Sequence, residues 1–215
     1  MKLNLANKLT IFRIILVPIM MIIPVIDGIS GLSGSFLEVP NVFWIMNLIF
    51  IIASITDKLD GYIARSRNQV TTFGKFLDPL ADKILVLSAL VILVEYGKIP
   101  SWIPIIVLAR EFIVSGYRLI AVEKGGKVIA ASKWGKLKTV TQMIAIIFCF
   151  LDKFKFGQFI FRVSSDVGVN SAEIYMTTAQ FAINIISTIM LIISVIATIF
   201  SGIDYLKNGK DLLKD

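Results

Sequence analysis

The chain alternates between long apolar runs and short polar stretches, and this pattern predicts its helices. A helix that crosses a membrane needs about 20 mostly apolar residues, and backbone polar groups inside a bilayer are satisfied within helices. On that scale the sequence predicts an all-α integral membrane protein with six transmembrane helices in a single domain, residues 1–215. The expected spans cover residues 11–27, 42–64, 79–97, 99–121, 135–152 and 177–204.

The residues before the first expected span are interpreted as a short N-terminal interfacial segment. The opening MKLNLANKLTIFRI mixes basic and apolar residues as a signal peptide does, but Arg13 comes late. No small-residue cleavage site follows the apolar run, so we expect a retained span. Pro18 and Pro24 lie inside it and predict a bend, or packing against a partner helix.

The basic residues predict the orientation of the spans. With six spans, most of the 22 Lys and Arg residues fall on the side of the membrane that holds the N-terminus. Cytoplasmic segments carry such an excess, so both termini are expected in the cytoplasm. The net charge of +7 suits anionic lipids and anionic substrates. Because the basic residues are scattered among the spans, nucleic acid is not an expected partner.

The composition restricts the chemistry that is available. The chain is 56% hydrophobic and only 17% charged, which is typical of a membrane protein. It has one cysteine, Cys149, and no histidine. These counts exclude an internal disulfide, histidine-based metal sites and a histidine base or nucleophile. Any reaction must therefore use carboxylates, Lys, Arg, Tyr or hydroxyl groups.

Four aspartates gather where the second expected span meets the third. They are Asp57, Asp60, Asp78 and Asp82. The first two are three residues apart and the last two are four apart, so each pair shares one face of a helix. A loop of about a dozen residues, 64–75, can bring the pairs together. Pro79 disfavours a helical conformation at the residue before it, so Asp78 is expected to cap the third helix.

Four carboxylates that converge beside hydrocarbon repel one another strongly. They stay ionised together only if cations lie between them, and hard oxygen ligands favour Mg²⁺, Mn²⁺ or Ca²⁺. The alternative is that each aspartate caps a helix or pairs with a nearby Lys or Arg. The spacing, with Gly61, Ala64 and Gly74 interspersed, favours a metal site. These small residues leave room for a ligand, although they also permit close helix packing.

The pattern Asp57-x-x-Asp60-Gly61-x-x-Ala64-Arg65, eight residues, Gly74-x-x-x-Asp78-x-x-x-Asp82 resembles the signature of the CDP-alcohol phosphatidyltransferases. Members of this family are six-span membrane enzymes that transfer a phosphatidyl group from a CDP-linked lipid to an alcohol and release CMP. The resemblance implies a homodimer in a bacterial plasma membrane, with its site facing the cytoplasm.

The resemblance also implies roles for individual residues. Asp57, Asp60 and Asp78 are expected to bind two divalent cations, Mg²⁺ or Mn²⁺. Asp82 is expected to contribute to the same site and to act as the general base. The nucleotide is expected to contact Asn7, Thr10, Gly61, Ala64, Arg65 and Gly74.

A second group of charged residues follows in the fourth and fifth expected spans. Arg110 and Glu111 lie within an apolar span, where an ionisable side chain usually has a task or a partner, and Arg118 lies about two turns farther along the same face. Such cations suit a phosphate on the acceptor alcohol, while the alternative is the general excess of basic residues in cytoplasmic segments. The candidate acceptor-phosphate ligands are Arg110, Arg118, Lys133, Lys136 and Lys138.

The arrangement REF…SGYR…AS…GKLKT, together with the opening segment, resembles the branch of the family that joins CDP-diacylglycerol to glycerol 3-phosphate. Phosphatidylglycerol and inositol phosphate stay open as acceptors. If the protein is not an enzyme, the alternative is a divalent-cation transporter, but transporter sites usually lie near the middle of the bilayer. The aspartates are expected at one interface instead. Nothing catalytic is expected in the outer loop 152–176.

Overall fold

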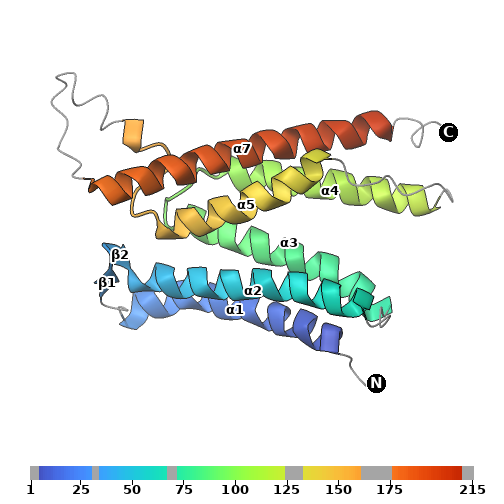
Figure 1. The fold of residues 1–215 in the computed structure, drawn as a ribbon, viewed down its shortest axis with the longest axis horizontal. Coiled ribbons are helices and arrows are strands. Elements are labelled where there is room, and N and C mark those ends of the chain that lie inside the picture. Colours follow the sequence, from blue (N-terminus) through green and yellow to red (C-terminus); the bar gives the residue numbers. More distant parts are fainter. Residues whose placement is uncertain (1–4, 31–33, 67–71, 124–132, 161–175, 210–215) are drawn as a thin grey trace. The chain divides into compact units, whose positions relative to one another are not determined.

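The computed structural model of the chain describes residues 5–30, 34–66, 72–123, 133–160 and 176–209, which are almost entirely helical (Figure 1). A helix covers each of the six predicted spans, so the all-α fold class is confirmed. The helices are α1 Leu5–Ser30, α2 Asn41–Ser66, α3 Thr72–Glu95, α4 Trp102–Glu123, α5 Lys133–Leu151 and α7 Thr178–Asn208.

Three of the described helices are long and apolar enough to cross a membrane. Their apolar stretches are Asn7–Gly28, Lys133–Leu151 and Thr178–Lys207. The helices α2, α3 and α4 combine apolar turns with the aspartates or with arginines. The chain is thus a helical membrane protein, whereas six spans with both termini in the cytoplasm stay a prediction.

The internal contacts divide the chain into two compact units, Met1–Tyr96 and Gly97–Asp215. In the first unit, α1 packs along α2 and also against α3. The core of this unit contains the fully buried side chains of Met20, Met46, Phe50 and Leu85. The two units describe packing within the chain, and the single domain over 1–215 stays a prediction.

In the second unit, α7 packs along α5 and against α4. Ile146 and Phe150 of α5 are fully buried, and Leu191 of α7 is 1% exposed. The polar side chains of α7 are also buried at several turns, and they form the two clusters described below. Helix α7 is therefore the element that organises this unit.

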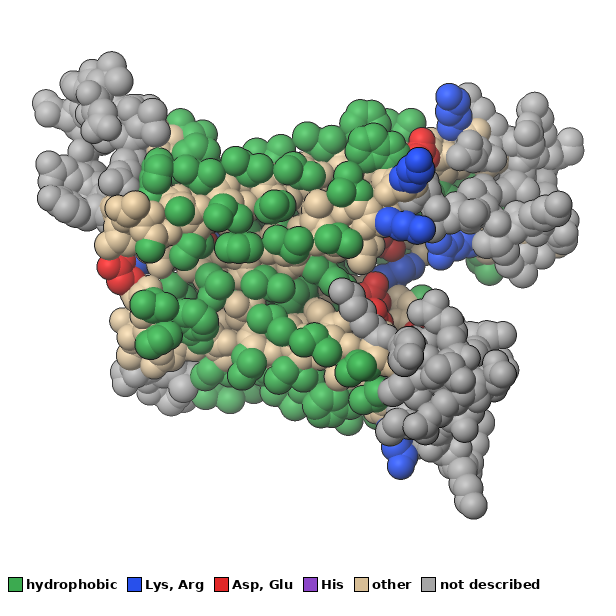
Figure 2. Space-filling model, in the orientation of Figure 1, with side chains coloured by type: hydrophobic (Ala, Val, Ile, Leu, Met, Phe, Trp, Pro, Cys, Tyr) green, Lys and Arg blue, Asp and Glu red, His purple; other side chains and the backbone are tan. Residues whose placement is uncertain are grey.

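Large apolar side chains remain exposed at helical spacing. On α4, Ile105, Phe112 and Leu119 are 63%, 69% and 70% exposed, and their seven-residue spacing puts them on one face. Figure 2 shows hydrophobic side chains over much of the visible flanks of the helices. Apolar faces of this kind match the hydrocarbon of a bilayer.

Asp78 does not cap a helix, in contrast to the expectation from Pro79. Helix α3 begins at Thr72, so Asp78 and Pro79 both lie inside it. The missing N–H of proline costs one backbone hydrogen bond, which membrane helices tolerate when neighbouring groups satisfy the freed carbonyl. The connection between α2 and α3 is accordingly reduced to residues 67–71, which lie outside the described residues.

Residues 5–10 form the first turns of α1, and their location at the membrane interface stays a prediction. Between α1 and α2, β1 (Ser35–Phe36) pairs antiparallel with β2 (Val39–Pro40), a hairpin that was not predicted from the sequence. The turn residues Leu37 and Glu38 have φ of 51° and 65°. Such turns usually contain Gly or Asn, and because Leu37 and Glu38 are neither, the sequence did not predict the hairpin.

Candidate functional site

Helix α1 presents a buried polar face in the first unit. Asn7, Thr10 and Arg13 are three residues apart, which puts them on one side of the helix. They are 7%, 1% and 0% exposed. A guanidinium that is removed from water in this way needs a counter-charge and hydrogen-bond acceptors.

Two of the four aspartates contact this face. Nη1 of Arg13 lies 2.6 Å from Oδ1 of Asp57 on α2. Oγ1 of Thr10 donates a hydrogen bond of 2.7 Å to Oδ1 of Asp78 on α3. Helix α1 therefore connects the two helices that carry the aspartate pairs, and it holds one carboxylate of each pair.

The residues present fit a divalent cation in their chemistry. Carboxylate oxygens are the ligands that Mg²⁺ and Mn²⁺ prefer, and each carboxylate offers about four lone-pair sites, of which the contacts above use only some. No three His, Cys, Asp or Glu residues among those with described side chains lie close enough together to hold a metal. The side chain of Asp60 lies outside the described residues, so the site of four aspartates stays a prediction.

The predicted nucleotide contacts lie at the same end of the first unit. Gly74 is buried in the first turn of α3. Gly61, Ala64 and Arg65 lie in the last turns of α2, but their side chains are outside the described residues. The hydroxyl of Thr10 faces Asp78, and the role of these residues toward a nucleotide stays a prediction.

In the second unit, two of the predicted acceptor ligands share one carboxylate. Nη1 of Arg110 lies 2.9 Å from Oε1 of Glu111 on α4, and Nζ of Lys138 on α5 forms an ion pair with the same oxygen. The side chains of Arg110 and Lys138 are 12% and 8% exposed. Two nearly buried cations thus share one anion among the residues that the structure describes.

Helix α7 adds neutral side chains to these contacts. Nη2 of Arg110 donates to Oγ of Ser201 at 2.5 Å, and Nη2 of Arg118 donates to Oη of Tyr205 at 2.9 Å. Both guanidiniums lie over the Tyr205 ring, 5.8 and 5.7 Å from its centroid, which is within cation–π range. We call the following residues the cationic cluster: Arg110, Glu111, Arg118, Lys138, Ser201 and Tyr205.

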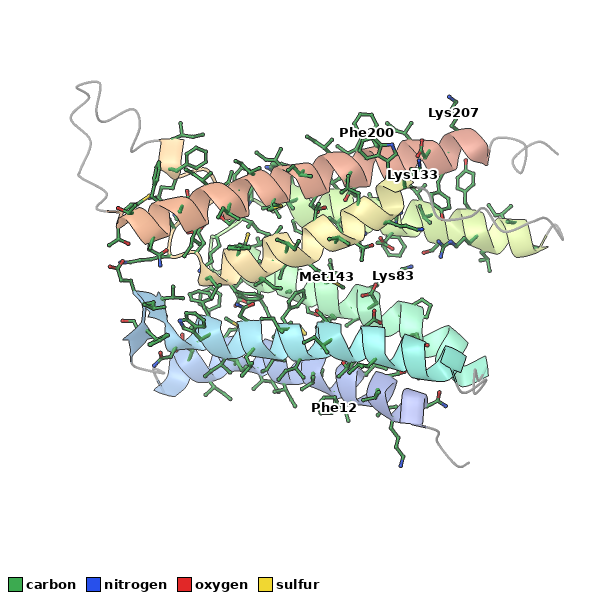
Figure 3. The ribbon with its side chains drawn as sticks, viewed as in Figure 1. Phe12, Lys83, Lys133, Met143, Phe200 and Lys207 are labelled. Carbon is green, nitrogen blue, oxygen red and sulfur yellow. The ribbon has the colours of Figure 1, made fainter. Side chains whose placement is uncertain are left out.

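Lys133 and Lys136, the other predicted acceptor ligands, are exposed on the first turn of α5. Figure 3 shows Lys133 at the start of that helix. Among the described contacts, neither lysine joins the cationic cluster. Their expected role toward the acceptor stays a prediction.

Ser201 and Tyr205 were not singled out from the sequence. They are four residues apart, which places them on one face of α7, and Gly202 lies beside them. A Cβ added to Gly202 would lie 3.6 Å from Cγ of Arg110, so this part of α7 lies close to the aliphatic stem of that arginine. The spacing alone resembles ordinary helix packing and does not indicate a site.

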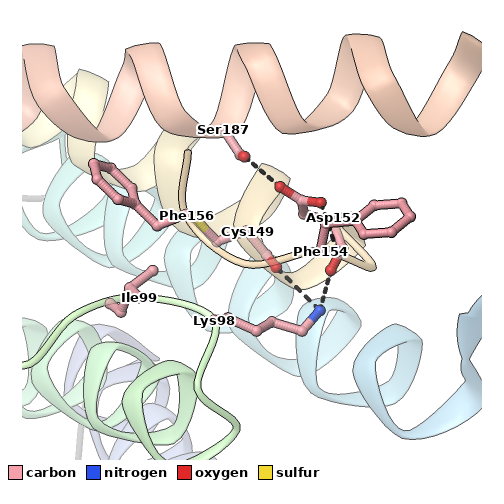
Figure 4. Close-up of a pocket in the computed structure, with 7 residues that line it drawn as sticks. All are labelled: Lys98, Ile99, Cys149, Asp152, Phe154, Phe156 and Ser187. Carbon is pink, nitrogen blue, oxygen red and sulfur yellow. Dashed lines mark hydrogen bonds between the residues drawn. The ribbon is translucent and has the colours of Figure 1, made fainter. Parts of the chain in front are cut away.

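A second buried polar cluster occupies the other end of this unit (Figure 4). Nζ of Lys98 donates to the backbone carbonyl of Asp152 and to two carbonyls in the last turn of α5 at 3.4 Å. The Asp152 carboxylate accepts hydrogen bonds from Ser187 at 2.6 Å and Asn184 at 2.8 Å, both on α7. We call Lys98, Asp152, Asn184 and Ser187 the Lys98 cluster.

Burial shifts both charged groups of the Lys98 cluster toward their neutral forms. It lowers the pKa of Lys98 to about 8, against the opposing effect of the Asp152 charge. It raises the pKa of Asp152, although hydrogen bonds from Ser187, the Phe154 backbone and Asn184 act in the other direction. The cluster joins one potential cation to one potential anion and ties the end of α5 to α7.

Partly buried aspartates in the first unit and clustered cations in the second are the features of a helical membrane protein that handles charged groups. A family model described as CDP-alcohol phosphatidyltransferase matches residues 3–203. The chain belongs to the CDP-alcohol phosphatidyltransferase family, as its aspartate pattern predicted. It is therefore an enzyme of a class whose members generally depend on divalent metal ions.

Three bacterial relatives share one name, CDP-diacylglycerol–glycerol-3-phosphate 3-phosphatidyltransferase. The protein of Bacillus subtilis (strain 168) is 49% identical over 144 residues, which are 66% of this chain and 74% of the relative. That of Haemophilus influenzae is 44% identical over 150 residues, 68% of this chain and 75% of the relative. That of Wigglesworthia glossinidia brevipalpis is 40% identical over 150 residues, 68% and 76% of the two chains.

Proposed function

We propose that this enzyme transfers the phosphatidyl group of CDP-diacylglycerol to the 1-hydroxyl of glycerol 3-phosphate. The products are phosphatidylglycerophosphate and CMP. The names of the relatives above support this reaction. The observation that carries it within the structure is the cationic cluster, where Arg110 and Lys138 share one carboxylate and Arg118 lies over the same Tyr205 ring as Arg110. An acceptor that brings its own phosphate suits such a surplus of positive charge.

In the first unit, Asp57, Asp60, Asp78 and Asp82 would hold two divalent cations, Mg²⁺ or Mn²⁺. When bound, these ions offset the negative charge of the lipid diphosphate and of the departing phosphate. The contacts from α1 orient two of the carboxylates, because ligands with fixed hydrogen bonds keep their geometry. Gly61, Ala64, Arg65, Gly74, Asn7 and Thr10 are proposed to contact the cytidine nucleotide.

Asp82 is proposed as the general base, since the chain has no histidine for this role. It takes the proton of the acceptor hydroxyl while the hydroxyl oxygen forms a bond to the β-phosphorus of the lipid donor. The bond from this phosphorus to the bridging oxygen breaks, and CMP leaves with the electron pair. A carboxylate can serve as a base near neutral pH when positive charge lies nearby.

In the second unit, the acceptor phosphate is proposed to bind Arg110, Arg118 and Lys138, with Lys133 and Lys136 adding positive charge. Guanidinium groups bind phosphate with paired hydrogen bonds. The enzyme is proposed to be a homodimer in a bacterial plasma membrane, with its site facing the cytoplasm. The excess of basic residues on one side of the predicted topology supports this orientation.

The decisive experiment measures CMP release by the purified enzyme in micelles or liposomes that contain CDP-diacylglycerol. CMP release is expected only when glycerol 3-phosphate and Mg²⁺ or Mn²⁺ are both present. A panel with phosphatidylglycerol, inositol phosphate, inositol and serine tests the acceptor. A preference for an acceptor without a phosphate would overturn the assignment, and ion flux without CMP release would favour a transporter.

Asp82→Asn tests the proposed base, because it keeps the shape of the side chain and removes its basicity. We expect turnover to fall about 10²–10⁴-fold, while binding of Mn²⁺, followed by electron paramagnetic resonance, stays within a few-fold of the wild type. Asp27→Asn is the matched control, since Asp27 lies near the opposite end of α1. Near-normal turnover of Asp82→Asn would show that another group is the base.

A further inference from the structure

The two arginines of the cationic cluster are held by neutral groups, and Arg110 also contacts Glu111. Both guanidiniums lie over the ring of Tyr205, at 5.8 and 5.7 Å from its centroid. The ring is 1% exposed, and its hydroxyl accepts the hydrogen bond from Arg118. One tyrosine of α7 therefore contacts two cations that lie two turns apart on α4.

The kind of contact matters because it leaves the charge of the cluster unchanged. A carboxylate in place of Tyr205 would neutralise one arginine, whereas the face of an aromatic ring attracts cations through its quadrupole and carries no net charge. The hydroxyl of Ser201 is also a neutral acceptor. Helix α7 thus orders two guanidiniums and still leaves them able to attract an anion.

One donor of this cluster has no partner in the described structure. Nε of Arg110 is buried and makes no hydrogen bond to any described residue. Arg has five N–H donors, and the described contacts of Arg110 engage its terminal nitrogens, Nη1 with Glu111 and Nη2 with Ser201. A buried donor without a partner is unfavourable, and a phosphate oxygen is a suitable acceptor for it.

We propose that Tyr205 is a positioning residue, whose ring and hydroxyl hold Arg110 and Arg118 in the arrangement that receives the phosphate of the acceptor alcohol. This inference rests on the proposed function, because it assigns the ligand of the cationic cluster to the acceptor substrate. Tyr205 itself carries no charge and does not replace either arginine in binding. Its contribution is to the affinity for the acceptor, and not to the chemical step.

Two substitutions separate the ring from the hydroxyl. Tyr205→Phe keeps the ring and removes the acceptor of Arg118. The KM for glycerol 3-phosphate is expected to rise about 3–10-fold, as for the loss of one ordinary hydrogen bond, because Tyr205 acts on the phosphate only through the arginine. Tyr205→Leu also removes the ring, and the KM is expected to rise about 30-fold, since two cation–π contacts are lost as well. In both variants kcat at saturating glycerol 3-phosphate and the KM for CDP-diacylglycerol are expected to stay within about two-fold of the wild type.

Phe200→Leu is the matched control. Phe200 lies on the same helix and stacks on Trp134 with a centroid distance of 5.0 Å, and it is 46% exposed. Its replacement tests the general effect of removing an aromatic ring from α7, and no change in the KM for glycerol 3-phosphate is expected. Stabilisation of each protein by glycerol 3-phosphate in a thermal unfolding assay gives a readout that is independent of turnover.

The outcomes distinguish this inference from the proposed function. If the wild type releases no CMP with glycerol 3-phosphate, the proposed function fails. If it does, but Tyr205→Leu and Tyr205→Phe keep the wild-type KM and the wild-type stabilisation by glycerol 3-phosphate, only the role of Tyr205 is wrong. A parallel loss of kcat and of affinity for both substrates would show that Tyr205 serves only in packing. If the leucine variant does not fold, Tyr205→Phe alone still distinguishes these outcomes.

Discussion

The two polar clusters of the second unit both combine charged side chains with neutral hydrogen-bonding groups, but we assign them different roles, structural for the Lys98 cluster and ligand-binding for the cationic cluster. The Lys98 cluster contains one lysine and one aspartate, and burial moves the pKa values of both toward the neutral forms. The cationic cluster contains three cations and one glutamate. Both are held by side chains of α7. They differ in burial, because Lys98 and Asp152 are 6% and 3% exposed whereas Arg118 is exposed, and they also differ in the balance of charge.

This difference indicates how a binding site can be distinguished from a structural network in a membrane protein. Buried charges are costly unless each has a partner. The Lys98 cluster meets that requirement with carbonyl groups in the last turn of α5 and the amide and hydroxyl groups of α7. In the cationic cluster, among the described residues, Arg110 and Lys138 share the one carboxylate of Glu111, and an anionic ligand would offset the remaining positive charge.

Arg118→Ala sharpens the comparison through the largest expected effect on the KM for glycerol 3-phosphate. Loss of one charge-assisted contact to a phosphate is expected to raise the KM for glycerol 3-phosphate by about 10–100-fold, with kcat little changed. Steady-state CMP release over a range of glycerol 3-phosphate concentrations measures it. Lys207→Ala is the control, because Lys207 is an exposed cation in the last turn of α7 (Figure 3).

An unchanged KM in Arg118→Ala would exclude this arginine from acceptor binding. An equal rise in Lys207→Ala would mean that general positive charge at this end, and not the ordered cluster, attracts the substrate. In that case the two clusters would still differ in charge, but the cationic cluster would not be a specific binding site for the acceptor phosphate.

Asp152→Ala tests the other cluster, where the expected effect is on stability. The change removes the carboxylate that accepts from Ser187 and Asn184, each of which keeps one backbone acceptor, and it removes the negative charge near Lys98. We expect a loss of about 2–3 kcal/mol in the free energy of unfolding, seen as a lower midpoint of thermal unfolding in detergent. The KM for glycerol 3-phosphate is expected to be unchanged at temperatures where the variant is folded.

Asp204→Ala, an aspartate of α7 that is only partly buried, is the control for this substitution. A large rise in the KM of the Asp152 variant would contradict the assignment of the Lys98 cluster to structure alone. It would also remove the contrast between the two ends of the second unit.

The sequence predicted the helices well because their signal is the length of the apolar runs. All six expected spans coincide with helices to within a few residues at most ends. The start of α3 was placed too late, because the rule for residues before proline outweighed the helical pattern that begins at Thr72. The hairpin at Leu37 and Glu38 has no sequence signal, since neither residue favours positive φ.

The family and the charged residues of the candidate site were also predictable, because aspartates and arginines are conspicuous among apolar residues. Their neutral partners were not. Ser201 and Tyr205 are ordinary residues for a membrane helix, and their roles follow only from contact with α4. The same holds for the pairing of Arg13 with Asp57, which requires α1 and α2 to be adjacent.

The pH dependence of stability is the test of the comparison with the smallest expected effect. The pKa of Lys98 is lowered from 10.5 to about 8 in the folded protein, so between these values the unfolded chain binds more protons than the folded one. The titration of Lys98 therefore contributes stability that rises with pH across this window, by at most about 1.4 kcal/mol for each pH unit. Thermal unfolding at pH 8 and about pH 9 measures this rise, and Lys98→Met, which cannot titrate, is expected to lack it. If the stability of Lys98→Met rises equally with pH, another group is responsible and Lys98 keeps its proton. Both clusters would then contain fully charged groups, and the contrast between them would be weaker.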